Sequence, residues 1–136
     1  MREHTKENVK KYGEIFTPPA LVKQMLDTLS LDNSKTTVLD PCCGSGNILV
    51  EALQRKLDAG HNPIEALSTI FGVEIQERLV VECRKRLLYK ALTKSQFTII
   101  GDLKEVLLPI LEKNIVCGNF LKGEFDGNGN WRKKKS

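Results

Sequence analysis

The sequence predicts an α/β fold with a parallel sheet, and three observations support this prediction. Short apolar segments suited to buried strands alternate along the chain with segments of helical periodicity. A glycine-bearing turn at 44–46 joins the first of these strands to the helix that follows it. Each strand then returns through a helix, which is the connection that parallel strands require. The length of 136 residues suits one such unit with a modest core.

The first predicted helix covers about residues 18–30. Thr17 is a suitable cap, and the two prolines after it stand where a missing backbone amide costs nothing. The apolar residues that follow recur at helical spacing and define one face of the helix: Leu21, Val22, Met25, Leu26 and Leu29. A polar loop at 32–34 then leads into a short strand at 37–39.

A second helix is predicted from Asn47 to Gly60, where the glycine favours a helix end. A short helix follows Pro63, and residues 69–73 form a buried strand. The strongly charged segment 76–92 forms another helix, whose apolar face is made by Leu79, Val80, Cys83, Leu87 and Leu88.

The last third of the chain has a less regular pattern. We expect a strand at 97–100, a helix at 103–112 and a strand at 115–120. Residues 123–136 contain three glycines, two asparagines and a basic run, so we interpret them as an unfolded or unfinished connection.

The formal net charge of +4 is carried by one short run near the C-terminus. Its members are Arg132, Lys133, Lys134 and Lys135, and the residues before them sum to zero. Composition therefore indicates no DNA-binding face, and the run is typical of a solvated tail or linker.

The sequence indicates neither a membrane-spanning segment nor a metal site. No apolar stretch is long enough to span a membrane, and the polar start has no signal-peptide character, so we expect a cytoplasmic protein. The cysteines at 42, 43, 83 and 117 lack the spacing and the histidines of a zinc site. We expect reduced thiols that pack as small apolar residues, with neither a metal nor a disulfide.

The turn after the first strand carries the main chemical signal. Asp40 ends the strand, and Gly44-Ser45-Gly46 leads into the helix. A dinucleotide fingerprint requires glycine where Leu49 stands, and a P-loop requires a lysine directly after its glycines, whereas the next lysine here is Lys56. The turn therefore suits a ligand that approaches the backbone closely and has no phosphate.

S-adenosylmethionine (AdoMet) is such a ligand. Asp40 could face its ammonium group, and the amides that open the next helix could face its carboxylate. The alternative is a tight strand-to-helix turn that binds nothing.

Glu74 supports the ligand interpretation. It ends the strand that follows, at the edge where open parallel sheets collect their ligands. A carboxylate there can accept both hydroxyls of a ribose. Alternatively, Glu74 forms an ion pair with a lysine or arginine of the next helix.

Four segments together carry a resemblance to a known family. They are GEIFTPPALVKQML at 13–26, VLDPCCGSGNILVEAL at 38–53, IFGVEIQERL at 70–79 and NIVCGNFL at 114–121. They resemble successive motifs of the adenine-specific DNA methyltransferases of bacterial restriction and modification systems. The resemblance covers about residues 12–121 and is to the subgroup in which the AdoMet-binding motifs precede the catalytic one.

The resemblance implies a partial Rossmann-like AdoMet-dependent methyltransferase fold with an incomplete sheet. It also implies three parts of the chain: a polar N-terminal segment at 1–16, the AdoMet-binding half of the domain at 17–121, and a flexible basic tail or linker at 122–136.

Two groups of residues resemble the parts that bind the methionine end of AdoMet. Thr17 and Pro18 resemble the N-terminal motif that closes over this end of the cofactor. The family's loop beneath the methionine is resembled by the turn in this sequence, through Asp40, Pro41, Gly44, Gly46 and Asn47.

Four further residues resemble the parts that bind the adenosine. Glu74 is similar to the ribose-binding acid, and Ile75 to the residue that packs on the adenine. Asn119 and Phe120 correspond to a pair usually written Asp-Phe, in which the acid accepts a hydrogen bond from the adenine amino group and the ring covers the base. Asn119 departs from this pattern, since an amide oxygen accepts more weakly than a carboxylate. The alternative for Phe120 is a plain core residue.

The sequence lacks the family's catalytic Asn/Asp-Pro-Pro-Tyr/Phe motif. Its one double proline is preceded by Thr17 and followed by Ala20. In the family this loop holds the target adenine after it is flipped from the duplex, so no catalytic residue is predicted here. We therefore expect a portion that is truncated or split before the catalytic loop, inactive alone, and associated with DNA through a region outside this chain.

The parent reaction implied by the resemblance is direct methyl transfer to the exocyclic amino group of adenine. It needs no covalent enzyme intermediate, so Cys42 and Cys43 are not expected to be nucleophiles. Two alternatives remain: a methyltransferase part that acts on RNA or protein, and a non-catalytic remnant or interaction module.

An incomplete sheet would expose the apolar edge of its first strand. We therefore expect self-association, or pairing with a complementary chain that supplies the rest of the domain.

Overall fold

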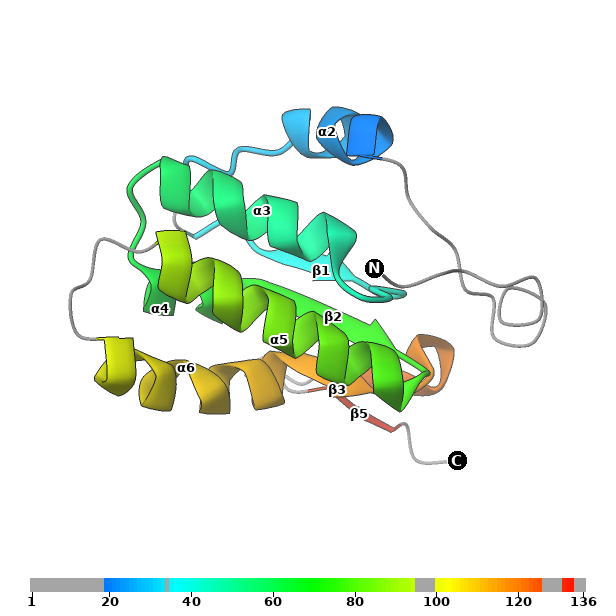
Figure 1. Ribbon diagram of the computed structural model, residues 1–136. Coiled ribbons are helices and arrows are strands. Elements are labelled where there is room, and N and C mark those ends of the chain that lie inside the picture. The colour runs from blue at the N-terminus through cyan, green and yellow to red at the C-terminus, as the bar shows by residue number, and fades with distance from the viewer. Residues whose placement is uncertain (1–18, 34, 95–99, 126–130, 134–136) are drawn as a thin grey trace.

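A computed structural model describes residues 19–33, 35–94, 100–125 and 131–133 (Figure 1). Its helices are α2 (Pro19–Asp27), α3 (Asn47–Asp58), α4 (Pro63–Ser68), α5 (Glu77–Lys94) and α6 (Ile100–Asn114). Its strands are β1 (Val38–Asp40), β2 (Ile70–Glu74), β3 (Ile115–Cys117), β4 (Gly123–Phe125) and β5 (Trp131–Lys133), with a 3-10 turn η1 (Phe120–Lys122) before β4. None of the described helices could cross a membrane.

The main sheet has the order β1-β2-β3, and both pairs are parallel. Leu39 is in register with Phe71, and Val73 with Val116. Strands alternate with helices along the chain, so the predicted α/β class is confirmed as an open, partial Rossmann-like sheet. Because the three strands are parallel, their carboxyl ends meet at one edge.

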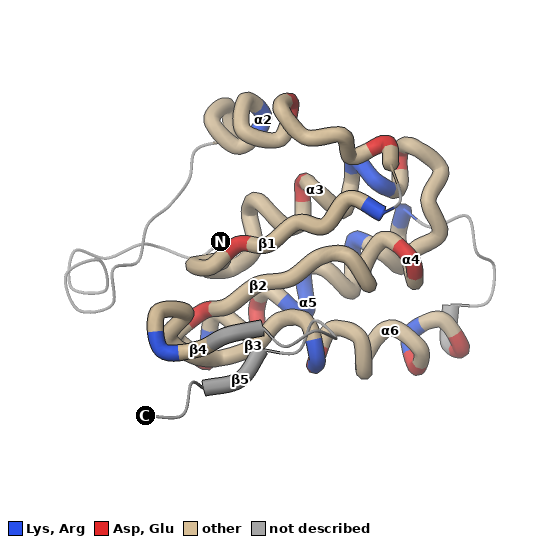
Figure 2. The backbone as a smooth tube through the Cα atoms, turned by 180° about the vertical axis from the view of Figure 1, so that it is seen from behind, with Lys and Arg blue, Asp and Glu red and all other residues tan. Residues whose placement is uncertain are grey.

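The helices α3 and α5 pack side by side across the sheet, as Figure 1 shows. Figure 2, seen from behind, shows the three strands next to one another with these helices beyond them. The core between the layers is aliphatic, and its fully buried side chains include Leu49, Leu53, Ile70, Leu87 and Leu107. Each such side chain contributes about 1.5–3 kcal/mol to the stability of the fold when it is buried. The packed core thereby holds the strand ends in place.

Gly72 of β2 is required by this close packing. A Cβ at position 72 would lie 2.8 Å from Cδ1 of Leu49 and 2.9 Å from Sγ of Cys43. The missing side chain therefore lets α3 and the turn that precedes it lie directly on β2.

β1 lies at the edge of the sheet. Among the described residues it pairs with β2 alone, and Leu39 at its centre is 44% exposed. The exposed apolar edge predicted for the first strand is present in this part of the chain.

The structure differs from the sequence predictions at three places near the C-terminus. Ile100 begins α6, so it is not part of a strand, and the remainder of the predicted strand at 97–100 lies outside the described residues. β3 ends at Cys117, three residues early, because Asn119 caps η1 and turns the chain.

The third difference is the segment predicted to be an unfolded or unfinished connection. Here β4 and β5 form an antiparallel pair, with Phe125 in register with Trp131. Asp-Gly and Asn-Gly stand between the two strands in the sequence, and these are the dipeptides that favour a hairpin. The prediction was wrong because the same residues are also common in linkers.

Candidate functional site

The turn between β1 and α3 depends on two glycines in the left-handed region, Gly44 with φ 55° and Gly46 with φ 96°. A Cβ at Gly44 would meet nothing within 4 Å, so this part of the backbone faces open space. A Cβ at Gly46 would lie 2.7 Å from Sγ of Cys83, so α5 lies directly beneath it. One glycine leaves room for a ligand, and the other lets the turn lie on the helix.

Backbone hydrogen bonds hold the turn against β2. The amide of Cys43 donates to the carbonyl of Val73 at 3.0 Å, and the amide of Gly46 donates to the carbonyl of Cys43 at 2.9 Å. The Val50 amide donates to the Gly46 carbonyl at 2.8 Å and thereby starts the hydrogen-bond ladder of α3. The amides of the first turn of α3 thus open toward the carboxyl edge of the sheet.

Glu74 joins the ends of β1 and β2. Its side chain is buried, with 5% exposed, and its Oε1 accepts a hydrogen bond from the Gly44 amide at 3.1 Å. Its Oε2 accepts from the amide of Gln76 at 2.8 Å. Among the described residues no ion pair links Glu74 to a lysine or arginine, so the alternative of pairing with the next helix is not what the structure has.

Asp40 brings a second carboxyl group to the same edge. Its Oδ1 accepts a hydrogen bond from the Cys42 amide at 3.1 Å. Burial raises the pKa of Asp40, and the hydrogen bond from Cys42 opposes this shift. Burial also raises the pKa of the Cys42 thiol, and the nearby Glu74 and Asp40 add to the effect. An edge with these two acids favours a cationic group.

The loops after β2 and β3 bring the remaining predicted residues to this edge. Ile75 follows Glu74 and is 51% exposed, and the thiol of Cys117 lies 3.5 Å from its carbonyl oxygen. Asn119 follows β3, and its Oδ1 accepts a hydrogen bond from the Leu121 amide at 3.0 Å. Phe120 is half-buried. Asn119 therefore has a structural role as the cap of η1, and its contact with adenine stays a prediction.

Among the predicted site residues, Pro41 lies exposed in the turn and Asn47 begins α3. Thr17 and Pro18 lie outside the described residues. The structure thus brings the predicted residues of three strand ends together and leaves those of the N-terminal motif undescribed.

Arg86 of α5 is a site residue that sequence reasoning missed. Its Nη1 donates to the Ser45 carbonyl at 2.9 Å, to Ser45 Oγ at 3.2 Å and to Asn47 Oδ1 at 2.8 Å. No local pattern marks it, because it lies within a helix of mixed charge and its partners are about forty residues earlier in the sequence.

A cavity of about 380 Å³ lies beside the start of α3. It is lined by Pro19, Val22, Lys23, Asn47, Val50, Glu51 and Arg86. The cavity lies on the helical side of the turn, and the acids Asp40 and Glu74 are not in its lining.

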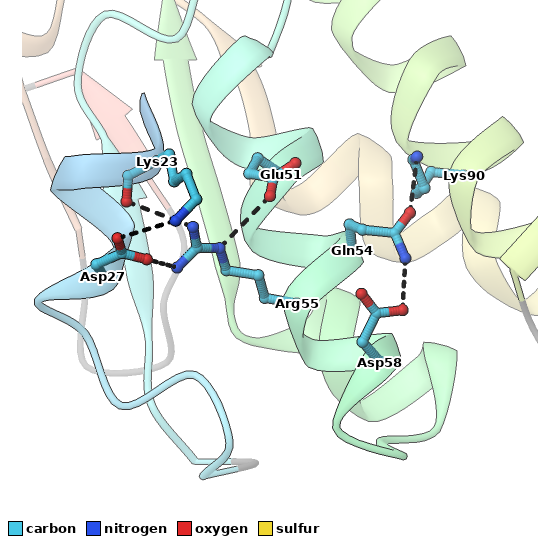
Figure 3. A network of polar contacts seen from close by, with 7 residues as sticks. All are labelled: Lys23, Asp27, Glu51, Gln54, Arg55, Asp58 and Lys90. Atoms are coloured by element: carbon cyan, nitrogen blue, oxygen red, sulfur yellow. Dashed lines mark hydrogen bonds and ion pairs between the residues drawn. The ribbon is translucent and has the colours of Figure 1, made fainter. Parts of the chain in front are cut away.

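A network of polar contacts fixes α2 against α3 (Figure 3). Nη1 of Arg55 lies 2.7 Å from Oδ1 of Asp27, and Nε of Arg55 lies 3.5 Å from Oε1 of Glu51. The hydrogen bond from Arg55 lowers the pKa of Asp27. The network therefore fixes the position of α2, which begins at Pro19, on the rest of the fold.

Comparison with known proteins identifies the family. Residues 1–104 match the family described as N-6 DNA Methylase. The chain is 38% identical over 77 residues to the type II methyltransferase M.VspI of Vibrio sp. (strain 343), which is 57% of this chain and 17% of that protein. It is 31% identical over 123 residues to the putative type II restriction enzyme and methyltransferase RM.MjaORFECS2P of Methanocaldococcus jannaschii, which is 79% of this chain and 10% of that protein.

The chain is also similar to a protein of a type I restriction system. The type I restriction enzyme MjaVII methylase subunit of Methanocaldococcus jannaschii is 29% identical over 93 residues, which is 68% of this chain and 15% of that protein. The chain thus spans between 10% and 17% of the length of these relatives. No solved structure matches it significantly. The chain belongs to the N-6 DNA methylase family.

Proposed function

We propose that this chain is the AdoMet-binding portion of a DNA adenine methyltransferase from a restriction and modification system. The observation that carries the proposal is the buried carboxylate of Glu74, which accepts from the Gly44 amide and so joins the turn after β1 to the turn after β2. The hydrogen bond supports the proposal, because Glu74, the proposed ribose acid, lies directly beside the turn that we propose binds the methionine end.

The residues at the carboxyl edge fit AdoMet. A carboxylate has about four acceptor positions, and among the described residues Glu74 accepts one backbone amide on each oxygen, which leaves positions that ribose hydroxyls could use. Gly44 offers open backbone, and Ile75 offers exposed apolar surface to a base. Asp40 and Glu74 suit a ligand with a positive ammonium and sulfonium.

AdoMet, when bound, supplies a methyl group activated by its sulfonium. In the proposal, Asp40 binds the ammonium, and the amides that open α3, with Pro41, Gly44, Gly46 and Asn47, bind the methionine carboxylate and its neighbourhood. Glu74 binds the ribose. Ile75 and Phe120 would pack on the adenine, and Asn119 would accept a hydrogen bond from its amino group. Thr17 and Pro18 would close over the methionine end.

The parent enzyme transfers the methyl group to the exocyclic amino group of adenine in DNA, in the cytoplasm. In the proposal, the catalytic loop and the DNA contacts belong to a region outside this chain, so the chain alone is inactive. The methyltransferase nature of the parent enzyme is supported by the family match and by restriction and modification methyltransferases among the relatives.

The exposed edge at β1 supports the proposal of a complementary polypeptide. Parallel sheets are normally covered on both faces and bordered by further strands, whereas Leu39 in the edge strand is 44% exposed. We infer that the rest of the methyltransferase domain, or a second copy of this chain, pairs at this edge.

Titration of the purified chain with two ligands tests the cofactor proposal. S-adenosylhomocysteine (AdoHcy) retains the amino-acid part of the cofactor, whereas 5′-methylthioadenosine lacks it, and both contain the ribose. Protein NMR can follow even weak binding. Glu74→Gln should lower the affinity for both ligands by about tenfold or more, because a charge-assisted hydrogen bond contributes about 1.5–3 kcal/mol.

Glu77→Gln is the matched control, since Glu77 is an exposed acid of α5 only three residues away. It should leave both affinities unchanged. Binding by Glu74→Gln as strong as that of the unsubstituted chain would refute the ribose assignment. If the unsubstituted chain binds neither ligand, the non-catalytic interaction module becomes the better description.

A further inference from the structure

We propose that Arg86 is a positioning residue that fixes the AdoMet turn in its binding conformation without contacting the cofactor. The inference rests on the proposed function and adds a residue of α5 to a site otherwise built from the ends of strands. The three hydrogen bonds from its Nη1 to Ser45 and Asn47 carry the argument.

Arg86 and Cys43 hold the two sides of one peptide group. In a trans peptide the carbonyl and the amide point in opposite directions. The Ser45 carbonyl accepts from Arg86 at 2.9 Å, and the Gly46 amide in the same peptide donates to the Cys43 carbonyl at 2.9 Å. The plane of this peptide is thereby fixed directly before the first amides of α3.

The helix α5 touches the turn at a second point. Cys83, three residues before Arg86, lies beneath Gly46, where its Sγ would be 2.7 Å from a Cβ. Residues three apart in a helix share one face, so a single face of α5 supports the turn from below and holds it from the side.

The turn needs such support because of its glycines. Gly44 and Gly46 both adopt left-handed conformations, and glycine has the greatest backbone freedom to lose. A ligand's apparent affinity falls in proportion to the fraction of molecules with the binding-competent turn. A charged side chain that holds Ser45 and Asn47 raises this fraction before the ligand arrives.

Arg84 offers a matched control on the same helix. Its guanidinium donates to the Ile115 carbonyl at 2.9 and 2.6 Å and to the Glu112 carbonyl at 3.3 Å, so it ties α5 to the start of β3. Arg84→Met and Arg86→Met remove the same group from one helix, but only Arg86→Met frees the turn.

The first measurement needs no ligand. Amide hydrogen exchange of the full chain, followed by NMR, should show the Gly46 amide exchanging about tenfold faster or more in Arg86→Met, since local opening becomes easier. Arg84→Met should leave the exchange rate of this amide unchanged. Unchanged exchange at Gly46 in Arg86→Met overturns the inference.

The second measurement compares AdoHcy with 5′-methylthioadenosine. Arg86→Met should weaken AdoHcy binding by about tenfold and change the binding of 5′-methylthioadenosine little, because the turn faces the amino-acid part. Equal losses for both ligands, or the same loss in Arg84→Met, overturn the inference. Failure of the unsubstituted chain to bind either ligand overturns the proposed function, and the cofactor role of Arg86 with it.

Discussion

Asp40, which we propose binds the ammonium group of AdoMet, illustrates at the scale of one residue how such a group can lower the stability of the fold. Its carboxyl group is partly removed from water at the end of β1, and this burial raises its pKa above the ordinary value of 3.8. The folded chain is therefore less stable when Asp40 is ionised than when it is neutral. A carboxylate kept at such a position is typical of a binding site, where a cation can compensate for the lost solvation.

The pH dependence of stability follows from this shift. The folded chain holds the proton of Asp40 more strongly than the unfolded chain, so the contribution to stability is complete below pH 3.8 and is lost as the pH rises through the raised pKa. Asp40→Asn should therefore have a higher melting temperature than the unsubstituted chain at pH 7, with the difference vanishing near pH 3.8 and below. Thermal denaturation followed by circular dichroism measures the two melting temperatures across this pH range. A difference that is independent of pH would contradict the raised pKa of Asp40.

At the scale of elements, apolar patterning predicted α2, α3, α5, β1 and β2. The helices α3 and α5 bury one regular apolar face, and β2 is buried along most of its length. The face predicted for α2 is only partly right, because Val22 and Leu26 are buried whereas Leu21, Met25 and Leu29 are exposed. The same reasoning placed Asp40 and Glu74 at one edge, since carboxyl ends of parallel strands meet there. It did not find Arg86, whose role depends on packing between α5 and a distant turn. It also missed the β4 and β5 pair, because turn residues do not reveal whether the flanking strands will pair.

The turn between β1 and α3 allows a test with two glycines of similar conformation. Both Gly44→Ala and Gly46→Ala suffer from a left-handed φ, but only the methyl group of Gly46→Ala meets Cys83. Gly46→Ala should therefore be less stable than Gly44→Ala by about 1–3 kcal/mol, which is the usual result of overpacking. Urea denaturation gives the two free energies of unfolding, and equal values would show that the turn does not lie on α5 as described.

At the scale of the whole molecule, the described sheet is open, with β1 and β3 as its two edge strands and Leu39 of β1 exposed. The family match identifies what kind of protein this is, yet the chain spans only 10% to 17% of the relatives compared with it. Sequence motifs could locate the edge proposed to bind the cofactor because it is built from short contiguous segments. They could not identify the partner of β1, because strand pairing at an edge uses backbone groups that every residue has.

Self-association of the chain should respond to a charge on the edge strand. Leu39→Lys places a cation in β1, as natural edge strands often do, and should lower the average mass measured by light scattering at high protein concentration. Leu121→Lys is the control, because Leu121 is 84% exposed but lies outside the sheet. An unsubstituted chain that stays monomeric at every concentration, or an equal effect of both substitutions, would argue against pairing at β1.

The strand order β1-β2-β3 has a consequence for how the sheet is made during protein synthesis. In this sheet β2 and β3 each pair with the strand synthesised just before them, and the helices between are already complete when the later strand emerges. A nascent chain can therefore add these strands one at a time, in the direction of translation, without waiting for a distant partner. Throughout this growth the outer side of β1, the first of the described strands, pairs with none of the others.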